Sequence, residues 1–206
     1  MTLKLLFAGD GPRDEATVPR LVGGLLGIGI EHVFERWQGL HVRGGGKGLG
    51  GYGRKLLFLI RVARDRALDG VVAAVDCDKS QPGDKLRDLI AARQRDRDAS
   101  HATPAAIGEA VPHCEAWLID DPVAVRAALQ LPTTVEIASP TKIKSPKDEL
   151  DRLHQECGSP LETLQLLAAI AGGLAPERCN HRDATGFAAF ARDVVGELGP
   201  LCAAQS

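Results

Sequence analysis

One stretch decides the fold of this chain: Val71-Val72-Ala73-Ala74-Val75-Asp76-Cys77-Asp78. Five small or β-branched apolar residues in a row are typical of a strand covered on both faces, as in a parallel α/β sheet. Because side chains alternate along a strand, Asp76 and Asp78 are expected to point the same way at its carboxyl end. Ligands usually bind at that end, and two carboxylates there favour a divalent metal ion.

Strand-like and helix-like segments alternate along the rest of the chain. Strands are predicted at residues 3–8, 31–38, 71–75 and 105–111, and helices at residues 14–26 and 54–68 and before residue 97. This alternation is typical of a mostly parallel, doubly wound sheet flanked by helices. We therefore expect a Rossmann-like α/β domain over residues 1–158.

Two further helices are predicted to close the chain, at residues 161–171 and 183–198. The segment Ser159-Pro160-Leu161-Glu162 has the spacing of a capping box, with proline at the first helical position. We expect residues 159–206 to form a C-terminal helical extension that packs on the same domain.

The overall composition indicates a globular protein without a membrane anchor. The formal net charge is −2, so any binding of nucleic acid must come from a local basic patch. The five cysteines form no Cys-x-x-Cys pair, which argues against a zinc site and a disulfide framework and favours reduced thiols. No signal peptide and no apolar stretch of membrane-spanning length are recognised, so a cytoplasmic location is expected.

The first predicted strand also ends in an acid, within Gly9-Asp10-Gly11-Pro12. The flanking glycines let the backbone turn sharply and expose the Asp10 carboxylate in the crevice of the sheet. The alternative interpretation is that Asp10 caps the helix that follows.

A glycine-rich segment, residues 44–51, surrounds Lys47. It is not a Walker A loop, because Gly48 stands where that motif has serine or threonine. Between His41 and Arg66 there are seven basic residues and one acid, which favours contacts with nucleic-acid phosphates, whereas a solvated helix face is the alternative. The residues assigned to these contacts are Arg43, Lys47, Arg54 and Lys55.

Four short motifs in this sequence resemble those of TOPRIM domains, which occur in topoisomerases, primases and OLD-family nucleases. They are Asp10-Gly11-Pro12-Arg13-Asp14-Glu15, Asp76-Cys77-Asp78, Glu115-Ala116-Trp117-Leu118 and Ser145-Pro146-Lys147. The chain is most similar to small bacterial TOPRIM-like proteins found with phage-defence or ATPase genes. It departs from the family pattern at Asp10, where a glutamate is usual, and Glu15 is the acid that could replace it.

The resemblance implies a metal-dependent nuclease that acts on DNA or RNA with Mg²⁺ or Mn²⁺. Carboxylates from several strand ends can hold one or two such ions and activate a water molecule. The assigned metal ligands are Asp10, Asp76, Asp78 and Glu115. The assigned catalytic residues are Asp10 or Glu15 as general base, and Lys147 or Lys144 to neutralise charge in the transition state.

Other interpretations of these residues stay open. The chain could be a non-catalytic TOPRIM-like module that binds nucleic acid or metal, or that regulates a partner ATPase. A nucleotide-binding domain of another kind lacks support, because no glycine-rich phosphate motif follows the first strand. Glu115 could be a solvated residue at a helix start, and the two lysines could be ordinary surface residues. Trp117 is predicted to pack in the core.

Overall fold

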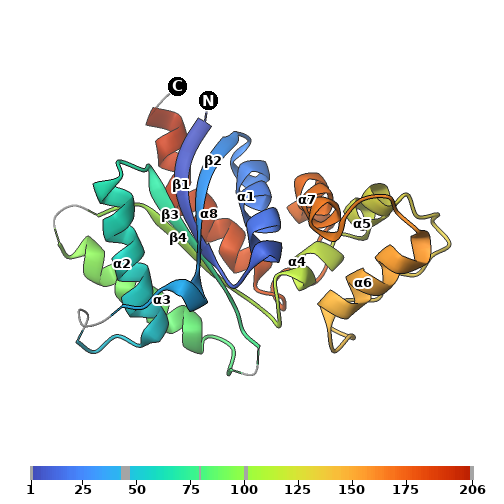
Figure 1. Cartoon of the computed structure of the whole chain (residues 1–206), viewed down its shortest axis with the longest axis horizontal. Coiled ribbons are helices and arrows are strands. Elements are labelled where there is room, and N and C mark those ends of the chain that lie inside the picture. Colours follow the sequence, from blue (N-terminus) through green and yellow to red (C-terminus); the bar gives the residue numbers. More distant parts are fainter. Residues whose placement is uncertain (1, 43–46, 79, 100–101, 205–206) are drawn as a thin grey trace.

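A four-stranded, all-parallel sheet forms the centre of the chain (Figure 1). The computed structural model describes residues 2–42, 47–78, 80–99 and 102–204. The strand order is β2-β1-β3-β4, with helices on both faces, which confirms the predicted α/β class. The strands are β1 (Thr2–Gly9), β2 (Gly29–Arg36), β3 (Gly70–Asp76) and β4 (Ala105–Ala110).

The central strand β3 is buried along its whole apolar run, and only Asp76 at its end reaches the solvent. Its small and β-branched side chains are covered on both faces, as the sequence predicts for a parallel strand. The edge strand β2 is far more exposed and carries charged residues, which discourages pairing with another chain.

Two hydrophobic cores lie on the two faces of the sheet. Helices α1 and α8 cover one face, and α2 and α3 cover the other (Figure 1). Their bounds are α1 (Pro12–Leu26), α2 (Gly51–Asp65), α3 (Asp84–Arg97) and α8 (Phe187–Ala204). Within the described ranges, no helix is both long and apolar enough to cross a membrane.

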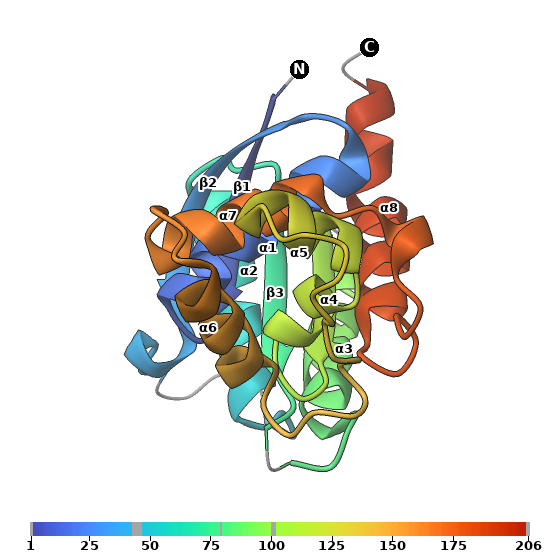
Figure 2. The same ribbon diagram turned by 90° about the vertical axis from the view of Figure 1, so that its right-hand side faces the viewer.

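Four short helices form a group beside α1, on the right of Figure 1 and in front of the sheet in Figure 2. They are α4 (Glu115–Ile119), α5 (Pro122–Leu129), α6 (Pro146–Cys157) and α7 (Thr163–Gly173); single 3-10 turns occur at η1 (Trp37–Gly39) and η2 (Pro176–Arg178). Trp117 of α4 is fully buried, stacks on Phe190 and donates its indole N–H to the Thr185 carbonyl at 2.7 Å. The prediction that Trp117 packs in the core is confirmed.

Helix α7 begins later than the sequence predicts. Its capping box is formed by Glu162 and Gln165, not by Ser159 and Glu162. The predicted start is wrong because the Ser159 hydroxyl accepts the Leu161 N–H at 3.3 Å in a local turn, which leaves the chain extended at Glu162.

The order of the strands creates one crevice suited to a ligand. The chain passes from β1 through α1 to β2 on one side, and then crosses through α2 to β3 on the other side of β1. The segments that leave β1 and β3 therefore diverge toward opposite faces of the sheet. In open α/β sheets, ligands bind at such a switch point. Asp10 follows β1 and Asp76 ends β3, so both acids lie at this point.

Candidate metal centre

A cleft of about 620 Å³ opens at the carboxyl ends of β1 and β3. The acids in its lining come from three regions that are far apart in the sequence: the β1–α1 turn, the end of β3 and the start of α4. Its polar lining residues are Asp10, Arg13, Asp14, Asp76, Asp78, His113, Glu115, Lys147 and Thr163. The structure therefore brings together the four residues assigned as metal ligands.

Asp76 stands at the centre of this cleft. Its Oδ1 accepts the backbone N–H of Cys114 at 3.0 Å, which fixes the carboxylate against the segment that precedes α4. Its own backbone N–H points toward Asp10, whose Oδ2 lies 3.5 Å away. Asp76 thereby connects the β1 end of the crevice with the α4 end.

Asp10 does not cap α1, and that alternative interpretation is wrong. The N-cap of α1 is Gly11, and no side chain caps this end of the helix. The Asp10 backbone N–H donates to Asp14 Oδ2 at 2.6 Å, so Asp14 is the residue that braces the turn. A Cβ atom on Gly9 would lie 2.7 Å from Asp14 Cβ, and this close approach requires glycine.

Asp78 reaches the same cleft by a different backbone path. It lies beyond the end of β3 in the left-handed region, with φ of 50°, a conformation that aspartate tolerates better than most residues. Its Oδ2 pairs with Lys85 Nζ at 2.8 Å, and its Oδ1 lies 3.4 Å from His113 Nε2. Lys85 also donates to the Asp76 carbonyl at 2.5 Å. The shared direction of Asp76 and Asp78 thus comes from a turn and not from strand alternation.

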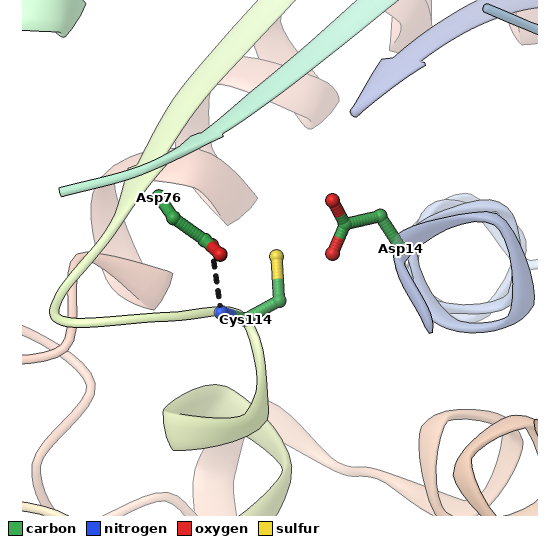
Figure 3. Close-up of side chains that lie close together, drawn as sticks. All are labelled: Asp14, Asp76 and Cys114. Atoms are coloured by element: carbon green, nitrogen blue, oxygen red, sulfur yellow. Dashed lines mark hydrogen bonds between the residues drawn. The ribbon is translucent and has the colours of Figure 1, made fainter. Parts of the chain in front are cut away.

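Two sets of three donors stand out among the residues that the structure describes. The inner set is Asp14, Asp76 and Cys114, and the outer set is Asp76, Asp78 and His113. Within each set the donor atoms all lie within 4.8 Å of one another, and the two sets share Asp76. Figure 3 shows the Cys114 sulfur pointing into the space between the Asp14 and Asp76 carboxylates.

The chemistry of these donors fits a divalent cation. Carboxylate oxygens, an imidazole nitrogen and a thiol sulfur are all metal ligands in proteins. In the described part of the chain, neither Asp14 nor Asp76 forms a salt bridge, although buried aspartates are normally paired. The Nδ1 atom of His113 is also buried without a hydrogen-bond partner.

The electrostatics of the cleft show how closely the acids are packed. Burial, together with the nearby Asp10 and Glu115 carboxylates, raises the pKa of Asp14 to about 6. Burial, together with repulsion from three neighbouring carboxylates, raises the pKa of Asp76 to about 8. Burial also raises the pKa of Asp10, although the positive charge of Lys85 opposes this. A bound cation would stabilise all three charged forms.

Glu115 is paired within the protein. Its Oε1 accepts from Arg13 Nη1 at 3.1 Å, and Arg13 Nη2 bonds both oxygens of Asp151 at 2.7 and 2.9 Å. Glu115 belongs to neither donor set. Arg13 thus joins α1, α4 and α6, and it holds α6 against the wall of the cleft.

We expect Arg13→Ala to lower the free energy of unfolding by about 2 kcal/mol, because it leaves the Glu115 carboxylate buried and unpaired. The value is below that of a fully buried pair because Arg13 and Asp151 are partly exposed. Urea unfolding at neutral pH measures it. Arg152→Ala is the matched control, since this exposed arginine pairs with Glu149 and Glu156 of its own helix α6, and its loss should cost under about 1 kcal/mol. Equal losses in both variants would contradict the bridging role of Arg13.

The remaining assigned catalytic residues divide between the cleft and the surface. Lys147, in the first turn of α6, lines the cleft and is exposed. Glu15 and Lys144 are exposed and do not line it. Glu15 points away because it follows Asp14 on the helix, and successive helical residues face different directions. Asp14 is therefore the second acid that the first motif contributes.

The basic segment lies on the other side of the sheet, around the start of α2. Arg43 lies outside the described residues. Lys47 and Arg54 are exposed, and Arg54 donates to the Leu49 carbonyl at 3.2 Å. Lys55 is half-buried and donates to the Trp37 carbonyl at 2.5 Å. These residues do not line the acidic cleft.

The glycines before and within α2 already bind an anion of the protein itself. The backbone N–H groups of Gly50 and Gly53 donate to the two Asp88 carboxylate oxygens, each at 2.7 Å. A Cβ atom at either glycine would lie 2.6 Å from an Asp88 oxygen, so this contact explains why glycine stands at both positions. In this structure these two amides are therefore not free to bind a phosphate.

Four residues of the centre were not assigned from the sequence: Asp14, Lys85, His113 and Cys114. Lys85 could have been predicted from the sequence, because it lies in the first turn of the helix that follows the Asp-x-Asp strand. A side chain there can reach back to the end of the strand. His113 and Cys114 directly precede Glu115, so they share the placement of the recognised Glu-x-Trp-Leu motif. No spacing rule in the sequence pairs Cys114 with Asp14.

Comparisons with known proteins assign no family and no function to this site. Searches against protein-family models, curated proteins and solved structures find no significant match. The resemblance to TOPRIM domains therefore stays a prediction from the short sequence motifs.

Proposed function

We propose that the protein is a divalent-metal-dependent enzyme that hydrolyses phosphodiester bonds in nucleic acid. The observation that carries this proposal is the pair of donor sets that share Asp76 at the switch point of a parallel sheet. Mg²⁺ or Mn²⁺ is the proposed cofactor for the outer, carboxylate-rich set. When bound, the ion would supply a Lewis acid and lower the pKa of a water molecule.

Residues around the cleft can perform the remaining steps. Asp10 lies beside Asp76, and its raised pKa makes it a better general base near neutral pH than an ordinary aspartate. Lys147 at the cleft wall can neutralise negative charge on a phosphate. Lys85 keeps Asp78 in place and lies close enough to Asp10 to favour its charged form.

A polymeric substrate suits the surroundings of this cleft. The ammonium groups of Lys55 and Lys85 lie 5.9 and 5.3 Å from the ring of Tyr52, at the start of α2. Lys85 links this cluster to Asp78 of the cleft. Together with Arg54, these cations could contact phosphates on one side of the cleaved bond.

A cleavage screen tests the proposal on plasmid DNA, single-stranded DNA and tRNA with Mg²⁺ or Mn²⁺. We expect cleavage of at least one substrate by the wild type, and a loss of about 100-fold or more in Asp78→Asn, because that change removes a ligand of the outer set. Asp65→Asn, at an exposed aspartate of α2 outside the cleft, is the matched control and should keep full activity.

Equal cleavage by the Asp78→Asn variant and the wild type would contradict the site. Failure to cleave any substrate would contradict the nuclease proposal. If salt-sensitive binding of nucleic acid then persisted, it would support the alternative of a non-catalytic module, or of a regulator of a partner ATPase.

A further inference from the structure

The inner donor set differs chemically from a magnesium site. Mg²⁺ prefers oxygen ligands, and it usually binds through carboxylates, phosphates and water. Here the third donor is the sulfur of Cys114, which is only 3% exposed and points between the Asp14 and Asp76 carboxylates (Figure 3). Sulfur donors select softer ions such as Zn²⁺.

The number of donors also matches a zinc site of a particular kind. Structural zinc ions have four protein ligands, whereas catalytic zinc ions have three and keep one position open. The inner set offers three donors, and two of its members, Asp14 and Asp76, also line the cleft. An ion held here would therefore present an open position toward the cleft.

The charge balance supplies an independent argument. Asp14 is buried, Asp76 is largely buried, and no salt bridge compensates either of them in the described part of the chain. Two carboxylates in contact with a thiol, without a basic partner, are unfavourable unless they are protonated or bind a cation. Two of the neighbouring cations pair with other acids: Arg13 with Glu115 and Asp151, and Lys85 with Asp78.

We propose that Asp14, Asp76 and Cys114 form a binding site for Zn²⁺ or a similar transition-metal ion, with Asp76 shared with the outer set. A role of this ion in catalysis rests on the proposed function, whereas the binding of the ion does not. The site discriminates against Mg²⁺ because a thiolate is a poor ligand for that ion. Two cations bridged by one carboxylate could clamp the attacking and leaving oxygens of a phosphodiester.

Co²⁺ provides a direct test, since it substitutes for Zn²⁺ and reports sulfur ligation through a thiolate-to-metal charge-transfer band in the near ultraviolet. The chelator-treated full chain is titrated with Co²⁺. We expect the band to appear at one equivalent, to disappear on addition of Zn²⁺ and to survive a large excess of Mg²⁺. Absence of the band from the wild type, or its removal by Mg²⁺, would overturn the proposal, and this measurement needs no variant.

Cys114→Ser then tests the identity of the sulfur ligand. We expect the band to vanish and the Zn²⁺ affinity to fall by at least about tenfold, as is common when the environment of a metal ligand is disturbed. Cys77→Ser is the matched control, because Cys77 is equally buried in the same region but donates its thiol to the Ser80 carbonyl at 3.2 Å. It should leave the band intact. A band that persists in Cys114→Ser would overturn the assignment.

The outcome separates this inference from the proposed function. If the wild type cleaves nucleic acid with Mn²⁺ and shows no charge-transfer band, the inner site is refuted and the nuclease stands. If the band appears but no substrate is cleaved, the inner site stands and the nuclease proposal fails.

Discussion

Replacing Asp76 with asparagine is expected to abolish metal-dependent cleavage and, at the same time, to make the metal-free protein more stable. Asp76 is the residue that the two donor sets share, so its loss removes a ligand from both. We expect the cleavage rate to fall on the order of 10³-fold or more. Stability should rise because the neutral amide removes repulsion among buried carboxylates.

The shape of the asparagine favours a folded variant. Its Oδ1 can keep the hydrogen bond from the Cys114 N–H, and its Nδ2 can donate to the neighbouring carboxylates. Unfolding in urea at pH 8 without metal should show a gain of about 1 kcal/mol or more over the wild type. If the free energy of unfolding of Asp76→Asn were instead lower than that of the wild type, the loss of cleavage would indicate a structural role for Asp76.

The second large effect expected is a strong dependence of metal binding and stability on pH. The pKa values of Asp14 and Asp76, about 6 and about 8, lie above the ordinary value of 3.8. Between pH 4 and pH 8 the metal-free folded state therefore binds more protons than the unfolded state, and its stability falls as pH rises. We expect a loss of at least about 2 kcal/mol between pH 5 and pH 8.

Metal binding should follow the opposite trend. A cation displaces protons from these carboxylates, so its affinity should rise by about tenfold per pH unit for each proton displaced between pH 6 and pH 8. Calorimetric titrations in buffers of different ionisation enthalpy measure the protons released. The control is Asp76→Asn, in which the free energy of unfolding and the metal affinity should both vary less with pH. A metal-free protein whose stability rises from pH 5 to pH 8 would contradict the predicted electrostatics.

The fold could be predicted because its signals are local. The apolar run from Val71 to Val75 is too uniform for an exposed strand, and the segments around it alternate between the two periodicities. The start of α7 was predicted wrongly because Ser159 satisfies a capping pattern in sequence but forms a turn in the structure. The sequence offers two possible capping boxes at this helix start, Ser159 with Glu162 and Glu162 with Gln165, and only the structure shows which of them forms.

The site could be predicted only in part, because its geometry depends on contacts between distant segments. Asp76 could be predicted from the strand that it ends, and Asp78 from its position two residues later, although a turn and not the strand directs its side chain. Asp14, by contrast, enters the cleft only because Gly9 lets the helix approach the strand, and Cys114 only because the segment before α4 returns to Asp76. No sequence motif predicts the close packing of α1 on β1 at Gly9, or the return of the segment before α4 to Asp76.

Cleavage of nucleic acid by the wild type and by Asp76→Asn, prepared side by side and assayed with and without Mn²⁺, tests the central claim most directly. The acidic cleft as described predicts products with the wild type that depend on the added metal and are removed by a chelator, and no products with Asp76→Asn. Cleavage at equal rates by both proteins, or cleavage by the wild type that persists without metal, would contradict it.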